Sequence, residues 1–221
     1  MINEIVFVLQ VAAVVASVRG AKRLGKEAVM TLATLLAVFA NVFVLKQIDL
    51  LGWTVTCSDA YVIGHLMCLN LLQQLHGKES AQKTITLSFS AMLIFAILSQ
   101  IHLLFSPSPF DKANGHYLAL LDVAPRLLTA SLATFYCMQR LDLFLFGKIR
   151  KVLPRFSWKA RSAVSLIISQ GFDTLLFTLL GLYGVVENWV SIFWMSFAVK
   201  CTAIGLMTLI WRDDVGEIHE V

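Results

Sequence analysis

Residues 161–184, with the sequence RSAVSLIISQGFDTLLFTLLGLYG, determine how the fold should be interpreted. The stretch is apolar and long enough to cross a bilayer, which takes about 20 residues of helix. Asp173 lies at its midpoint, and Gln170 lies one turn earlier. A carboxylate at that depth has little water to solvate it, so its position is costly. The stretch therefore predicts a membrane helix with a functional polar group at its centre.

The composition extends this prediction to the whole chain. Of its 221 residues, 58% are hydrophobic and 14% are charged, against about 25% charged in an average soluble domain. The apolar residues occur in runs of about 17–23, the length that spans a bilayer. We predict an all-α polytopic transmembrane helix bundle, a single membrane domain over residues 1–221 with a six-span core and an extra N-terminal span. The seven predicted spans are 2–18, 28–45, 53–75, 84–105, 117–138, 161–183 and 189–211.

The positive charges indicate an orientation for these spans. Segments 19–26, 76–83, 139–161 and 212–221 hold 14 of the 18 Lys and Arg residues. Cytoplasmic loops carry an excess of such residues. We therefore expect a multi-pass protein of the cell inner (cytoplasmic) membrane, with its N-terminus outside and its C-terminus in the cytoplasm.

Lys200 is a cation inside a predicted span. It lies at the midpoint of the seventh span, at the same depth as Asp173 in the sixth. Consecutive spans run antiparallel, so we predict a buried ion pair in which each residue offsets the other's cost. The pair could line a functional site, or it could only tie two helices together.

Two Gln-x-x-Asp segments stand out around this pair. Gln170 and Asp173 are three residues apart and share a helix face, and Gly171 between them would let another helix approach closely. Gln139 and Asp142 repeat the same spacing. This second segment could be an internal repeat, or Asp142 could simply be a solvated group at the cytoplasmic end of its helix.

Four more polar residues within the predicted spans are candidate binding residues. Arg126 follows Pro125 and could line a substrate path, or its side chain could extend to the outer surface. Asn41, Asn70 and Gln74 have amides that both donate and accept hydrogen bonds. Such amides bind polar ligands, but they also join helices in membranes.

Several classes of site are not indicated. The four cysteines are scattered singly and suggest neither zinc nor disulfides. No histidine shows metal-ligand spacing, and no phosphate-binding loop or HExxH motif is present. We therefore expect no metal, no cofactor, no enzymatic activity and no nucleic-acid partner. Proton coupling and the formation of a homo-oligomer are left open.

Four segments carry a resemblance to a known family. They lie between about Ala40 and Lys200 and are, in order, Asn41 to Gly52, Gly77 to Ala81, Pro125 to Phe146, and Trp158 to Phe177 with Lys200. In their order and spacing they resemble the queuosine precursor transporter family, also described as vitamin-uptake-like transporters.

The resemblance implies uptake of 7-deazaguanine compounds across the cytoplasmic membrane. The substrate would be queuine or its nitrile or aminomethyl precursors, a small nucleobase-like molecule. Asp173 and Gln170 would bind the base, with Lys200 balancing the charge of Asp173. Arg126 would line the path, and Asn41, Asn70 and Gln74 would complete the pocket. The alternative is a substrate-binding membrane subunit of an ATPase-energised vitamin or nucleobase uptake system.

Overall fold

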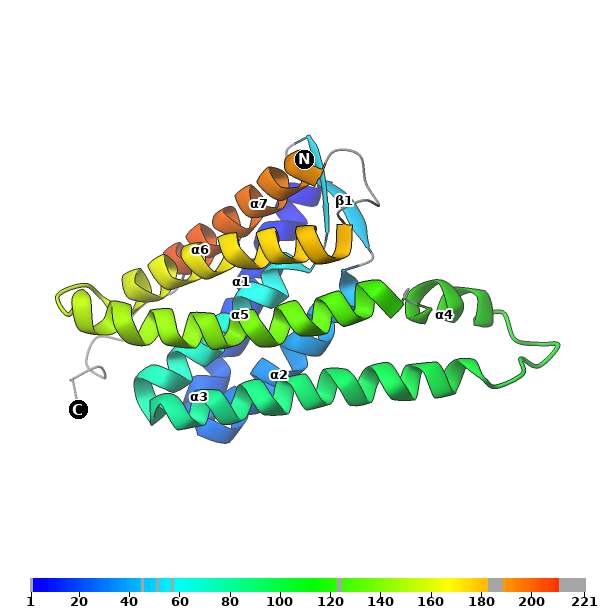
Figure 1. The fold of residues 1–221 in the computed structure, drawn as a ribbon, viewed down its shortest axis with the longest axis horizontal. Coiled ribbons are helices and arrows are strands. Elements are labelled where there is room, and N and C mark those ends of the chain that lie inside the picture. The colour runs from blue at the N-terminus through cyan, green and yellow to red at the C-terminus, as the bar shows by residue number, and fades with distance from the viewer. Residues whose placement is uncertain are drawn as a thin grey trace.

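The computed structural model describes residues 2–44, 46–50, 52–56, 58–122, 125–182 and 189–210. Within these ranges the chain is a bundle of long helices, which confirms the all-α prediction (Figure 1). A two-stranded antiparallel hairpin is the only sheet there. The elements are α1 (Ile2–Leu24), α2 (Lys26–Phe43), β1 (Gln47–Leu50), β2 (Trp53–Thr56), α3 (Asp59–Leu103), α4 (Asn114–Leu121), α5 (Pro125–Val152), α6 (Trp158–Phe177), the π-helix η1 (Thr178–Leu182) and α7 (Trp189–Ile210).

Several polar residues lie inside the bundle beside its apolar core, and many large apolar residues are exposed on its outside. His65, Asn70 and Gln170 are almost fully buried, whereas Leu98 and Phe172 are exposed. This arrangement suits a molecule surrounded by lipid. Five helical segments within the described ranges are long and apolar enough to cross a membrane, namely Ile2–Leu24, Lys26–Phe43, Asp59–Leu103, Trp158–Leu180 and Phe193–Ile210. The count of seven spans stays a prediction.

Helix α1 is an integral part of the bundle. Val11, Val15 and Val18 on one of its faces are almost fully buried. Where α1 meets α3, a Cβ at Gly64 would overlap the side chain of Val14. The small residue therefore allows these two helices to approach closely. Gln73 lies further along α3. Its side-chain nitrogen Nε2 is 3.0 Å from the position that a Cβ would take at Gly147 of α5.

The predicted span 53–75 is wrong at its start. Residues Trp53–Thr56 form β2, which pairs with β1 from Gln47↔Thr56 to Leu50↔Trp53, and helix α3 begins only at Asp59. The turn between the strands contains Gly52 at φ 82°, a conformation that glycine adopts without strain. A hydropathy run does not distinguish an apolar strand from a helical turn, so the strand was merged into the span.

Helix α3 turns back at a single residue. Gly77 has φ 80° and ψ 168°, with helix on both sides, and the second half of α3 then runs alongside α5 in Figure 1. The loop expected between the third and fourth spans is therefore reduced to one glycine. Non-glycine residues adopt a positive φ only at a cost.

Replacing Gly77 by alanine should destabilise the protein by about 1–2 kcal/mol, the cost of a Cβ in the left-handed region. Gly20→Ala in helix α1 is the matched control, since a Cβ meets nothing within 4 Å at either glycine. That change should be neutral or slightly stabilising. Thermal unfolding of the two variants in detergent measures the difference, and equal melting temperatures would contradict a backbone requirement at Gly77.

The predicted span 117–138 is divided by proline. Helix α4 ends at Leu121, and Pro125 is the first residue of α5. Proline lacks the N–H and suits the first position of a helix, so here it starts a helix and does not kink one. Helix α5 then continues to Val152, well past the predicted end of the span.

Candidate functional site

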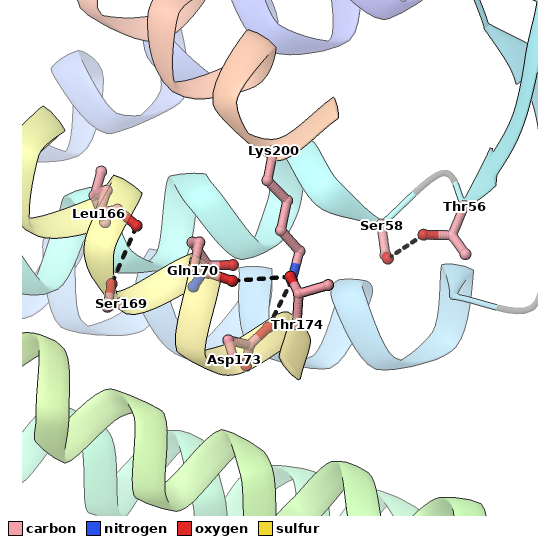
Figure 2. A network of polar contacts seen from close by, with 8 residues as sticks. All are labelled: Thr56, Ser58, Leu166, Ser169, Gln170, Asp173, Thr174 and Lys200. Atoms are coloured by element: carbon pink, nitrogen blue, oxygen red, sulfur yellow. Dashed lines mark hydrogen bonds and ion pairs between the residues drawn. The ribbon is translucent and has the colours of Figure 1, made fainter. Parts of the chain in front are cut away.

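The predicted ion pair between α6 and α7 is present. Lys200 Nζ lies 2.6 Å from Asp173 Oδ2, and the two side chains are 10% and 19% exposed. The ammonium also donates to Thr174 Oγ1 at 3.2 Å, and that hydroxyl donates to the Gln170 carbonyl at 2.8 Å (Figure 2). The lysine is therefore held by two consecutive residues of α6.

Helix α7 contacts α6 next to this ion pair. A Cβ at Gly171 would lie 3.4 Å from the ring of Phe197, which is an ordinary van der Waals distance. Phe197 stacks on Phe193 with a centroid distance of 6.1 Å and an interplanar angle of 8°. The two helices are therefore in contact at Gly171, but the spacing there does not require a glycine.

A second acid belongs to the same cluster. Asp59, the first residue of α3, is 5% exposed and lies close enough to interact electrostatically with both Lys200 and Asp173. Two carboxylates and one ammonium therefore share this region, one acid in excess. The N-terminus of α3 favours a negative charge at Asp59.

Asp142 is not the solvated helix end that the sequence suggested. It is 0% exposed, and its Oδ1 accepts hydrogen bonds from Ser165 Oγ at 2.7 Å and Ser169 Oγ at 3.0 Å. The helix continues to Val152, so Asp142 faces α6 well inside the bundle. Two neutral hydroxyls hold this carboxylate, in contrast to the lysine that holds Asp173.

Two of the predicted amide residues lie in the interior. Gln170 is 1% exposed, and its Oε1 has no hydrogen-bond partner among the described residues. Asn70 is fully buried and donates to Ser162 Oγ at 3.0 Å, while its own Oδ1 has no partner there. Asn70 therefore joins α3 to α6. Gln74, one turn further along α3, also has a buried oxygen that lacks a partner in the same ranges.

The structure does not bring Asn41 to the ion pair. Asn41 borders a separate, small pocket between α2, α3 and α4, together with Ser99, Gln100 and Leu121. A second small pocket lies between α3, α6 and α7 and is bordered by Ser162. Neither of these two pockets is bordered by Asp142 or the ion pair. The side chain of Arg126 lies outside the part of the chain that the structure describes.

The sequence analysis did not place Asp59 and Asp142 in the interior of the helix bundle. Residues 139, 142, 143 and 146 are all buried while Arg140 and Phe144 are exposed. This is the spacing of one helical face, and it could have placed Asp142 inside. Asp59 had no comparable signal, because its neighbours become clear only when α3 is packed against α6 and α7.

The comparisons with known proteins agree with this architecture. Residues 60–212 match a family model described as "putative vitamin uptake transporter". The chain belongs to this family. It is also 29% identical over 192 residues to the "Probable queuosine precursor transporter" of Bacillus subtilis (strain 168), a match that covers 85% of this chain and 83% of that protein. No solved structure matches the chain.

Membership of the vitamin uptake transporter family establishes the general activity. The chain is a multi-pass membrane transporter for a small molecule, and it is not an enzyme. The buried ion pair, the second acid at Asp59 and the hydroxyl-bonded Asp142 are therefore polar groups in the interior of a transporter, where such groups mark substrate and ion pathways.

Proposed function

We propose that this transporter imports a queuosine precursor, a 7-deazaguanine base such as queuine or its nitrile or aminomethyl precursors, across the cytoplasmic membrane. The observation that carries the proposal is the match along 85% of the chain to the Bacillus protein named for that substrate class. The interior supports it chemically, because a base with several N–H groups needs buried acceptors such as Gln170 Oε1, which has no partner among the described residues.

The substrate path would run between α3, α6 and α7. Gln170, Asp173 and Lys200 would border it near the middle of the membrane, and Asn70 and Gln74 would border it towards the cytoplasm. Arg126 stays a predicted path residue. The N-terminus would lie outside and the C-terminus in the cytoplasm, because this orientation puts the basic segments on the cytoplasmic side.

Restoration of queuosine in tRNA tests the substrate. A bacterial strain that can neither make nor import queuosine precursors would receive this chain and a low concentration of each candidate precursor. We expect tRNA queuosine to appear with at least one of them, whereas the same strain without the chain stays negative. If none of the precursors restores queuosine while the chain is present in the membrane, the substrate assignment is wrong.

A further inference from the structure

The interface between α5 and α6 holds a carboxylate that is only half bonded. Asp142 Oδ1 accepts from Ser165 and Ser169, but Oδ2 has no partner among the described residues. No cation of the described chain is in contact with this carboxylate. A buried polar atom without a partner is costly and needs an explanation. A ligand that donates hydrogen bonds would remove that cost.

Further acceptors without partners lie one turn away. The serine bonds to Asp142 fix the antiparallel register of α5 and α6, which places Gln139 at about the depth of Gln170. Their side-chain oxygens are buried and have no partner in the described ranges. The Gln139 side chain lies within hydrogen-bonding reach of the ring of His65, and Nδ1 of that ring contacts the Ala33 carbonyl at 2.8 Å.

The histidine and Gln139 are neighbours that can bond to each other. A carbonyl oxygen can only accept, so Nδ1 of His65 carries the proton of the neutral ring, and Nε2 is left with a lone pair. Nε2 is buried, and the Gln139 side chain is within hydrogen-bonding reach of the ring. The interior at this depth therefore leaves Asp142 Oδ2 and Gln170 Oε1 as acceptors for a ligand.

We propose that Asp142 is the residue that binds the N–H edge of the imported base. Oδ2 has two lone-pair sites, so it can accept from the ring N–H and the adjacent exocyclic amino group of a cyclic guanidine such as the edge of a guanine-like ring. Gln170 accepts from a remaining N–H group. Asp173 is less suited to this role, because the ammonium of Lys200 at 2.6 Å already offsets its charge. The proposal rests on the proposed function and names the group that selects its substrate.

Competition between substrates for uptake tests whether Asp142 binds the N–H edge of the base. Cells that take up a labelled 7-deazaguanine precursor through the wild-type chain would be challenged with the unlabelled base and with its analogue that lacks the exocyclic amino group. We expect the wild type to prefer the amino compound by about 10- to 100-fold, the range for a hydrogen bond to a charged group. Asp142→Asn should lose most of this preference. Asp111→Asn in an exposed loop is the matched control and should keep it.

The outcomes separate the two proposals. If the wild type takes up no precursor, the proposed function fails, and this inference falls with it. If the wild type takes up precursor and Asp142→Asn keeps the preference, the inference alone is overturned. A shifted pH optimum with unchanged preference would make Asp142 a proton carrier and would also overturn it.

A second pair of variants covers the case in which Asp142→Asn does not accumulate in the membrane. Ser165→Ala and Ser169→Ala each remove one donor to Oδ1 and keep the carboxylate. A fall in preference of about threefold or more in either variant supports the proposal, because the serines orient Asp142. Unchanged preference in both overturns it.

Discussion

Lys200→Met should lower the free energy of unfolding by about 3–5 kcal/mol, the cost of leaving a buried charge without its partner. Asp173 loses the ammonium at 2.6 Å, and the nearby Asp59 loses the same cation. Two acids that interact electrostatically then have no lysine to offset their charges. The methionine side chain has a volume similar to that of lysine, so packing contributes little to the loss.

Lys83→Met is the matched control for this effect. Lys83 is exposed on α3, and removing an exposed cation costs about 0–1 kcal/mol. Thermal unfolding in detergent and the amount of protein in the membrane measure both variants. Similar stability of Lys200→Met and Lys83→Met would contradict the buried pair.

The double variant Asp173→Leu/Lys200→Met should fold but should not transport. Replacing a buried ion pair by apolar residues of similar size is often neutral or stabilising, so most of the stability lost in Lys200→Met should return. Transport should still fall by about 100-fold or more. Each hydrogen bond to a charged group contributes about 1.5–3 kcal/mol, and 1.4 kcal/mol is tenfold. The substrate would lose two such groups along its path.

This double variant separates the two roles that the sequence left open for the pair. If the pair only ties α6 to α7, two well-packed apolar residues do the same, and uptake returns with stability. If the pair lines the path, stability returns and uptake does not. Initial rates of precursor uptake, normalised to the folded protein in the membrane, give the answer. Wild-type uptake by the double variant would contradict a role in transport.

The ion pair could be predicted from the sequence because it depends mainly on the depth of its two residues in the membrane and on the directions of their helices. Consecutive spans run antiparallel, so two residues at the midpoints of neighbouring spans lie at the same depth, and the cost of an unpaired charge in the membrane favours their pairing. Gly171 lies in contact with Phe197 of α7, at a distance that an alanine would also allow. These inferences depend on helix length and spacing, which a sequence encodes directly.

The remaining site residues depend on how helices pack, and prediction was weaker there. One of the two interpretations of the Gln139–Asp142 segment placed Asp142 at a solvated helix end, yet Arg140 and Lys148 are exposed on one face of a continuous helix whose other face is buried. Asn41 was grouped with the ion pair, but it borders a different pocket between α2, α3 and α4.

The central claim is that this chain imports a queuosine precursor. Uptake by the purified chain alone tests this claim most directly. The protein would be reconstituted into lipid vesicles with no other protein, and a labelled 7-deazaguanine precursor would be added outside, with and without a proton gradient. We expect saturable uptake that unlabelled queuine or its precursors compete away and that adenine does not. Folded protein that gives no uptake above protein-free vesicles, or uptake only after an ATPase partner is added, would contradict the account.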